Sequence, residues 1–147
     1  MKATAKLSSS LEDYLEAIYH LERINKSARA MDIARRLDVR GASVTAALQA
    51  LARRKLVNYQ PYKFITLTPE GRRLAIGVVR RHQTLHSFFV DVLDVDEEVA
   101  QRAACRMEHA LPQTIFNRLR GFVDYLDSNR DRAGELIEDF KSSFPRE

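Results

Sequence analysis

Two segments of the chain carry side chains that coordinate divalent transition metals, at spacings that bring them to one face of a helix. Asp13 precedes Glu16 by three residues, and Cys105 precedes Glu108 by three and His109 by four. Because residues three and four apart are neighbours on a helix surface, the members of each group can reach one ion together. Carboxylate, thiolate and imidazole groups are common protein ligands of such ions.

A third group consists of His82 and His86, which are four residues apart, and His20 follows Glu16 at the same spacing. Each group also has a simpler explanation. An acidic pair in a first helical turn is stabilised by the helix dipole, a lone cysteine is often a small buried apolar residue, and His82 could merely accompany the basic residues 80–81. Only the joint occurrence of the three groups favours a metal site.

The apolar residues recur mostly at helical spacing, which predicts a mainly α-helical fold. The first of three N-terminal helices begins after one of the serines at 8–10, the second covers about residues 28–37, and the third follows a turn at residues 38–41. The inward stripe expected on the second helix is Ala30, Ile33, Ala34 and Leu37. The stripe expected on the third is Val44, Ala47, Leu48 and Leu51.

Two short strands at residues 56–59 and 64–67 flank a polar turn, which predicts a hairpin. Helix, short helix, turn, helix and hairpin form the order of a winged helix-turn-helix, whose third helix can enter a DNA major groove. Hydroxyl and amide groups on that helix can reach base edges, and the nearby basic residues can neutralise phosphates. The residues expected to contact DNA are Arg40, Ser43, Thr45, Gln49, Arg53, Arg54 and Lys63.

The rest of the chain is predicted to be helical. Thr68 and Pro69 are typical of the N-cap and first turn of a helix, which we expect to reach about residue 93. Asp96 caps a further helix that extends to about residue 111, and Pro112 opens one that extends to about residue 126. One or two more amphipathic turns are expected around Leu136 and Phe140.

The charge is distributed unevenly over the 147 residues, whose formal net charge is +4. Residues 1–80 hold 15 Lys and Arg against 7 Asp and Glu, a net of +8, whereas residues 81–147 hold 9 against 13, a net of −4. A basic first half suits contact with a polyanion. The single cysteine excludes an internal disulfide and suits the cytoplasm, and the sequence contains neither a membrane span nor a signal peptide.

Several motifs together resemble the diphtheria toxin repressor family of metal-dependent transcriptional regulators. The motifs lie at residues 10–19, 32–34, 44–45, 67–71, 81–82 and 105–109. The resemblance implies a winged helix-turn-helix DNA-binding domain at residues 1–72 and a helical metal-binding and dimerisation domain at residues 73–147. It also implies that the chain ends before the third, β-barrel domain of the longer iron-responsive members, and in length it is similar to the manganese transport regulators.

The metal ligands implied by the resemblance are Asp13, Glu16, His82, Cys105, Glu108 and His109. This set combines two branches of the family. The manganese branch has a glutamate in place of Cys105, whereas the iron branch has the cysteine but a methionine in place of Asp13. The positions of the iron branch's second site read His82, His86 and Gln101 here, so the resemblance implies that this site is altered or absent, and His20 matches no family ligand.

The function that these features predict is a homodimeric, metal-activated repressor of metal-uptake genes, not an enzyme, with Fe(II) slightly favoured over Mn(II) as its cofactor. Thiolate favours softer ions and carboxylates tolerate Mn(II). The dimer surface is expected from residues 99–111 and from an apolar face on the following helix: Ile115, Leu119, Phe122, Val123 and Leu126. The alternatives are a winged-helix regulator that senses an organic ligand or a protein partner, and a small metalloenzyme, which would need a general base that the sequence does not offer.

Overall fold

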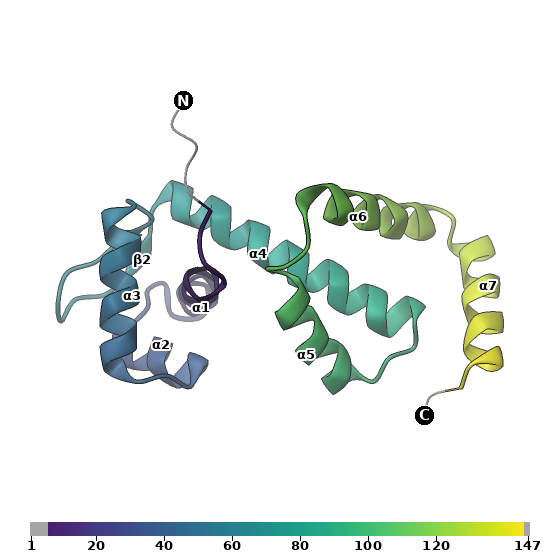
Figure 1. The fold of residues 1–147 in the computed structure, drawn as a ribbon, viewed down its shortest axis with the longest axis horizontal. Coiled ribbons are helices and arrows are strands. Elements are labelled where there is room, and N and C mark those ends of the chain that lie inside the picture. The colour runs from purple at the N-terminus through teal and green to yellow at the C-terminus, as the bar shows by residue number, and fades with distance from the viewer. Residues whose placement is uncertain (1–5, 146–147) are drawn as a thin grey trace. The chain divides into compact units, whose positions relative to one another are not determined.

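The computed structural model describes residues 6–145, and the chain divides into two compact units between Val79 and Arg80. As predicted, the fold is mainly α-helical with one small sheet (Figure 1). The first unit contains α1 (Ser9–Asn25), α2 (Ala30–Leu37), α3 (Gly41–Arg53), β1 (Val57–Asn58), β2 (Thr66–Leu67) and the beginning of α4 (Pro69–Ser87). The second contains the end of α4, a π-helical turn η1 (Phe88–Val92), α5 (Glu97–Met107), α6 (Gln113–Ser128) and α7 (Arg130–Ser143).

The three N-terminal helices close around one apolar core. Leu15 and Ile18 of α1 and Leu48 of α3 are completely buried. The predicted α3 stripe is confirmed, because all four of its residues are buried. The predicted α2 stripe is wrong at Ala30, which is exposed in the first turn of α2, while Ala28 before that helix is buried.

The hairpin is confirmed but its strands are shorter than predicted. β1 and β2 pair antiparallel, with Val57 opposite Leu67 and Asn58 opposite Thr66. Ile65 then leaves this ladder and exchanges backbone hydrogen bonds with Ala28, at 2.8 and 3.0 Å. The hairpin is therefore held at its base by the segment between α1 and α2.

The start of α4 is fixed by contacts to the hairpin. Thr68 caps the helix as predicted, because its hydroxyl oxygen accepts a hydrogen bond from the Gly71 amide at 3.1 Å. A Cβ added at Gly71 would lie 1.9 Å from the Leu56 carbonyl oxygen, so only glycine fits this close approach. The buried carboxylate of Glu22 on α1 accepts hydrogen bonds from the Leu67 amide at 2.7 Å and from Arg72 at 2.5 Å.

The second unit departs further from the expected boundaries. Asp96 caps α5 as predicted, but α5 ends at Met107 rather than near residue 111. The expected long helix continues from α4 into the π-helical turn η1, and the C-terminal segment forms the 14-residue helix α7 instead of one or two turns. None of the helices within residues 6–145 combines the length and apolar composition that crossing a membrane requires.

The apolar face predicted on α6 is divided between two sides of the helix. Ile115 and Phe122 are about half exposed. Leu119, Val123 and Leu126 are instead partly buried, on the side that carries the buried Phe116. The prediction that this face has no partner within the chain is therefore wrong for the three partly buried residues, and it stays a prediction for Ile115 and Phe122.

Candidate metal centre and nucleic-acid interface

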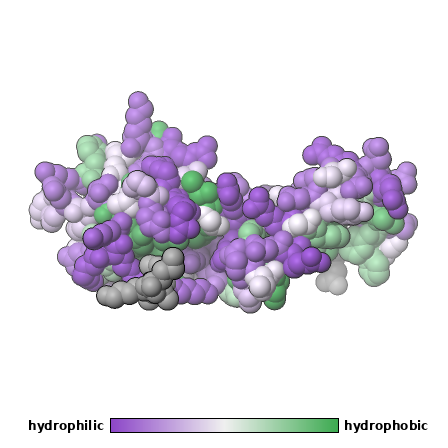
Figure 2. All heavy atoms as spheres, turned by 90° about the horizontal axis from the view of Figure 1, so that it is seen from above, coloured by the Kyte–Doolittle hydropathy of each residue, from purple (hydrophilic) through white to green (hydrophobic). Residues whose placement is uncertain are grey.

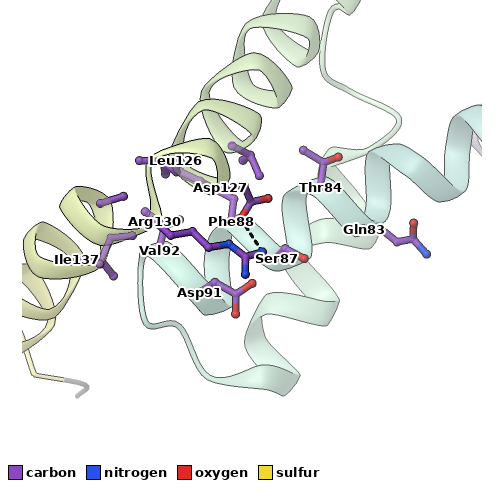
Figure 3. A pocket seen from close by; sticks show the side chains of 13 residues that line it. Gln83, Thr84, Ser87, Phe88, Asp91, Val92, Leu126, Asp127, Arg130 and Ile137 are labelled. Carbon is purple, nitrogen blue, oxygen red and sulfur yellow. Dashed lines mark ion pairs between the residues drawn. The ribbon is translucent and has the colours of Figure 1, made fainter.

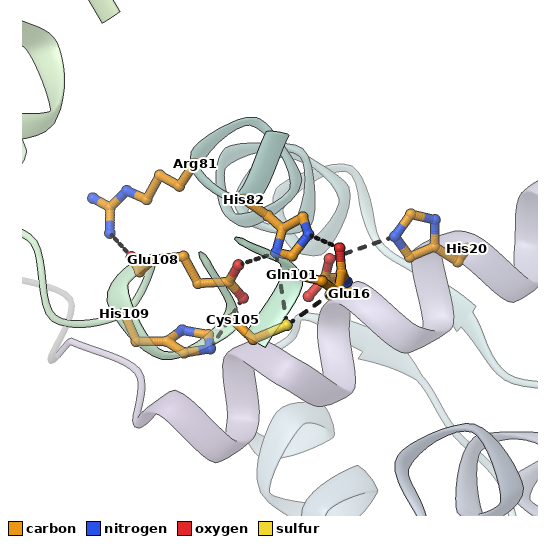
Figure 4. Close-up of polar contacts among 8 residues, drawn as sticks. All are labelled: Glu16, His20, Arg81, His82, Gln101, Cys105, Glu108 and His109. Carbon is orange, nitrogen blue, oxygen red and sulfur yellow. Dashed lines mark hydrogen bonds and ion pairs between the residues drawn. The ribbon is translucent and has the colours of Figure 1, made fainter. Parts of the chain in front are cut away.

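Four of the predicted ligands meet in the second unit, where α4 faces the C-terminal end of α5 (Figure 4). His82 Nδ1 lies 2.7 Å from a carboxylate oxygen of Glu108 and 3.8 Å from the sulfur of Cys105. His109 Nε2 lies 3.2 Å from the other carboxylate oxygen of Glu108. Glu108 therefore has an imidazole at each of its oxygens and a thiol group nearby.

Glu108 is held in an unusual position for a carboxylate. Only 2% of the surface of Glu108 is exposed, although Glu108 lies just beyond the C-terminal end of α5, where side chains are often exposed. Arg81 donates a hydrogen bond to the Glu108 backbone carbonyl at 3.2 Å and also contacts Gln113 and the ring of Phe116. Because a buried carboxylate is costly without compensating partners, this site needs positive charge or hydrogen-bond donors beside Glu108.

Gln101 completes the polar contacts of this group. Its side-chain oxygen lies 3.1 Å from His82 Nε2, and its side-chain nitrogen lies 3.9 Å from the Cys105 sulfur. Gln101 thus orients the imidazole from the side opposite Glu108, which is how groups around metal ligands commonly act. The two imidazoles, the thiol and the carboxylate together are a donor set that fits a divalent transition metal.

Asp13 and Glu16 lie on α1 in the first unit and are half-buried. Glu16 is 3.5 Å from His20 one turn later, so His20 contacts a predicted ligand. Tyr14 beside them is buried, and burial raises the pKa of its phenol. This neutral residue packs into the core while the two neighbouring carboxylates remain on the outer part of α1.

His86 takes a different role from His82. The two rings stack with centroids 6.1 Å apart, and His86 Nε2 lies 2.9 Å from the carboxylate of Glu97 at the start of α5. This contact joins the end of α4 to the beginning of α5. The expectation that the second site of the iron branch is altered or absent in this chain stays a prediction.

The predicted DNA-contacting residues all lie exposed on the first unit. Thr45 and Gln49 of α3 line a groove of about 840 Å³ together with Lys63 from the hairpin. Sequence reasoning missed two basic residues of this groove, Arg29 and Arg35, which come from the start of α2 and from its outer face. The guanidinium of Arg29 lies 5.1 Å from the ring of Phe64. Their positive charge was visible in the sequence, but their place beside the hairpin depends on the Ala28–Ile65 pairing.

The contacts of Gln101 and Arg81 were also missed as parts of the metal centre. Neither residue is a typical ligand, so residue type gave no signal for them. Both act through a ligand: Gln101 contacts the His82 ring, and Arg81 contacts the Glu108 backbone. Gln101 lies four residues before Cys105, and Arg81 directly precedes His82 in one of the motifs that carry the resemblance.

Both units of the chain match models of the same protein family. Residues 6–65 match the family model described as iron dependent repressor, N-terminal DNA binding domain, and residues 68–136 match iron dependent repressor, metal binding and dimerisation domain. The transcriptional regulator MntR of Bacillus velezensis is 34% identical over 127 residues, which cover 86% of this chain and 89% of MntR. The diphtheria toxin repressor of Corynebacterium glutamicum is 34% identical over 131 residues, covering 89% of this chain and 57% of that protein.

A solved structure of a manganese-dependent transcriptional repressor in complex with manganese is similar as well. Its TM-score is 0.71 at 27% identity, over 78% of this chain and 53% of the other. This chain thus spans about half the length of that structure, whereas it spans most of MntR.

Proposed function

We propose that this chain, which belongs to the iron dependent repressor family of metal-dependent transcriptional regulators, represses metal-uptake genes in response to Fe(II) or Mn(II). The family consists of DNA-binding regulators rather than enzymes, and its C-terminal domain binds metal and dimerises. What we propose for this chain itself is the metal to which it responds, its binding to an operator and its assembly as a homodimer.

The observation that carries the proposal is the buried carboxylate of Glu108 between His82 and His109, with Cys105 beside it. We assign these four residues, together with Asp13 and Glu16 of α1, as the ligands. A divalent ion held by these residues would add positive charge beside the buried carboxylate of Glu108. His82 is oriented for ligation by Gln101, and Glu108 is held in place by Arg81 through its backbone.

The ligand assignment explains how metal affects DNA binding. Asp13 and Glu16 are on the first unit, which carries the predicted DNA-contacting residues, and the other ligands are on the second. Sharing one ion restricts the first unit relative to the dimerisation domain, and this fixes the separation of the two recognition helices in a dimer. By linkage, metal and DNA then each strengthen the binding of the other by the same factor.

DNA binding itself is supported by the groove beside α3. Thr45 and Gln49 offer groups that can reach base edges, and Lys63, Arg29 and Arg35 place positive charge around them. We propose that Arg40, Ser43, Arg53 and Arg54 contact the phosphates at the ends of α3, because all four are exposed there.

We expect the thiolate of Cys105 to determine which metal ion the site prefers. Substitutions of Cys105 therefore test the proposed metal site. Cobalt bound to the wild-type protein is expected to show a thiolate-to-metal charge-transfer band, and uptake is expected to release protons and to weaken as pH falls. In Cys105→Ser the band should vanish and softer metals should weaken more than Mn(II), whereas Cys105→Glu should shift the preference towards Mn(II). An unchanged cobalt spectrum in Cys105→Ser would remove Cys105 from the ligand set and leave Mn(II) as the better candidate.

A further inference from the structure

We propose that Gln101 adjusts the metal preference of the site, because opposite ends of its side-chain amide hydrogen-bond to two assigned ligands, His82 and Cys105. The inference rests on the proposed function and gives a specificity-determining role in it to a residue that is not itself a ligand. Gln101 lies on α5, four residues before Cys105. Figure 4 shows its side chain in contact with both ligands.

The two ligands place opposite demands on a neighbouring polar group. Nδ1 of His82 faces Glu108 at 2.7 Å, and Nε2 lies 3.1 Å from the Gln101 side-chain oxygen. When Nδ1 of a neutral imidazole binds an ion, Nε2 carries the proton and can only donate a hydrogen bond. A ligating cysteine sulfur is a thiolate and can only accept one.

A side-chain amide meets both demands, because it carries its acceptor and its donors on separate atoms. The Gln101 oxygen faces His82 Nε2, and the Gln101 nitrogen lies 3.9 Å from the Cys105 sulfur. A carboxylate in its place would turn a second acceptor towards the thiolate, and an ammonium group would turn a donor towards the ring N–H. The arrangement of the amide in the structure is thus the one that the metal-bound forms of both ligands require.

The contact with sulfur affects which ions the site prefers. A hydrogen bond donated to a sulfur ligand draws electron density away from the metal–sulfur bond and makes the thiolate a weaker donor. This loss is larger for Zn(II), which binds thiolate well, than for Mn(II), which prefers oxygen ligands. Gln101 therefore allows a site that contains a thiolate to retain the harder ions.

A second glutamine provides a matched control. Exposed polar side chains are common on this chain, and hydrophilic residues cover most of the face shown in Figure 2. Gln83 directly follows His82 and is exposed, as Gln101 is. Gln83, however, lines a cavity of about 380 Å³ whose walls come from α4, η1, α6 and α7 (Figure 3). The same substitution at both positions separates contact with the ligands from mere proximity to them.

Gln101→Leu is the test variant, because leucine is of similar size, favours helix and removes both ends of the amide. In the anaerobic Co(II) complex, Gln101→Leu should move the thiolate-to-metal charge-transfer band to longer wavelength, because the sulfur becomes a stronger donor. Competition titrations should show the Mn(II) dissociation constant rising relative to that of Zn(II) by about 10-fold, the effect of one hydrogen bond. Both measurements on Gln83→Leu should match the wild type.

The Cys105→Ser background separates the two ends of the amide. In that background Gln101→Leu should still weaken every metal about 10- to 100-fold, because the His82 ring loses its partner. The ratio of the Mn(II) to the Zn(II) dissociation constant should then stay within about twofold, since the sulfur is gone.

Two results would overturn the role of Gln101 and leave the ligand set intact. One is a Gln101→Leu protein whose band and metal ratio equal those of the wild type, and the other is a ratio that changes equally in both backgrounds. A wild-type Co(II) complex without the band would overturn Cys105 as a ligand, and the inference with it. The wild type alone also offers a test, because nitrogen NMR of the Zn(II) complex should show His82 protonated at Nε2. Protonation at Nδ1 would contradict the inference.

Discussion

The two units of this protein bury their side chains in different ways. The first contains a core of fifteen buried apolar residues drawn from α1 to α4, from the hairpin region and from Ala28 between α1 and α2. In the second, the described buried residues are Leu85, Phe116, three alanines and Glu108, while several large apolar side chains on α6 and α7 are exposed. The first unit therefore has a larger apolar core of its own than the second, whose Glu108 is the residue that we propose to hold a metal ion.

The largest expected effect of a substitution lies in the core of the first unit. Leu48 is completely buried, so Leu48→Ala should lower the free energy of unfolding by about 2–5 kcal/mol, because it removes apolar contacts and leaves a cavity. Leu93 of the second unit is 40% exposed, and Leu93→Ala should cost less than about 1 kcal/mol. Urea denaturation followed by circular dichroism measures both values. Equal costs would show that the Leu93 side chain contributes as much to stability as the buried Leu48.

The same glycine substitution should have opposite effects in the two units. Gly71→Ala drives a methyl group into the Leu56 carbonyl oxygen and should destabilise the protein by about 1–3 kcal/mol. Gly134→Ala fills open space on α7 and should stabilise it by about 0.5–1 kcal/mol through helix propensity. Thermal unfolding of the two variants compares them directly. A destabilised Gly134→Ala would mean that α7 is packed more tightly than the cavity indicates.

The first unit was also the part that could be predicted best from the sequence. Its buried stripe on α3 and its Thr68 cap follow from periodicity and from local hydrogen bonding, which are encoded within a few residues. The exposure of Ala30 could not be predicted, because it depends on where α2 begins relative to the Ala28–Ile65 pairing. Such pairings join residues distant in sequence, and spacing along one helix carries no information about them.

The second unit was predicted less well for a related reason. The ligand types and spacing predicted that Cys105, Glu108 and His109 would lie together, but the helix ends at Met107, so a capping turn carries the last two. The extent of α7 was underestimated because Leu136 and Phe140 are exposed, so its apolar residues do not form a stripe that faces a core. Residue spacing predicts a helix best when one side of the helix packs against a core. It predicts less when the side chains are exposed or are proposed to bind an ion.

Replacing one partner of an exposed ion pair at the beginning of α4 should have a smaller effect. Arg73 donates hydrogen bonds to Glu70 at 2.6 and 2.9 Å, and these bonds hold the pKa of the Glu70 carboxyl below its ordinary value. The stabilisation from this pair is therefore present above the ordinary glutamate pKa and is lost as pH falls through the lowered value. In Arg73→Gln the Glu70 pKa should rise towards normal in an NMR titration. An unchanged pKa would show that the pair is not formed in solution.

The most direct test of the account is the affinity of the wild-type chain for operator DNA, measured anaerobically without metal and then with Fe(II), Mn(II) and Zn(II) in turn. We propose that a divalent ion held by Glu108, His82 and the other assigned ligands controls DNA binding. We expect weak binding without metal and an increase of about 10- to 100-fold with a suitable ion, corresponding to a coupling free energy of about 1.4–3 kcal/mol. Glu108→Gln should abolish that increase. Operator affinity that is the same with and without every metal would contradict the account.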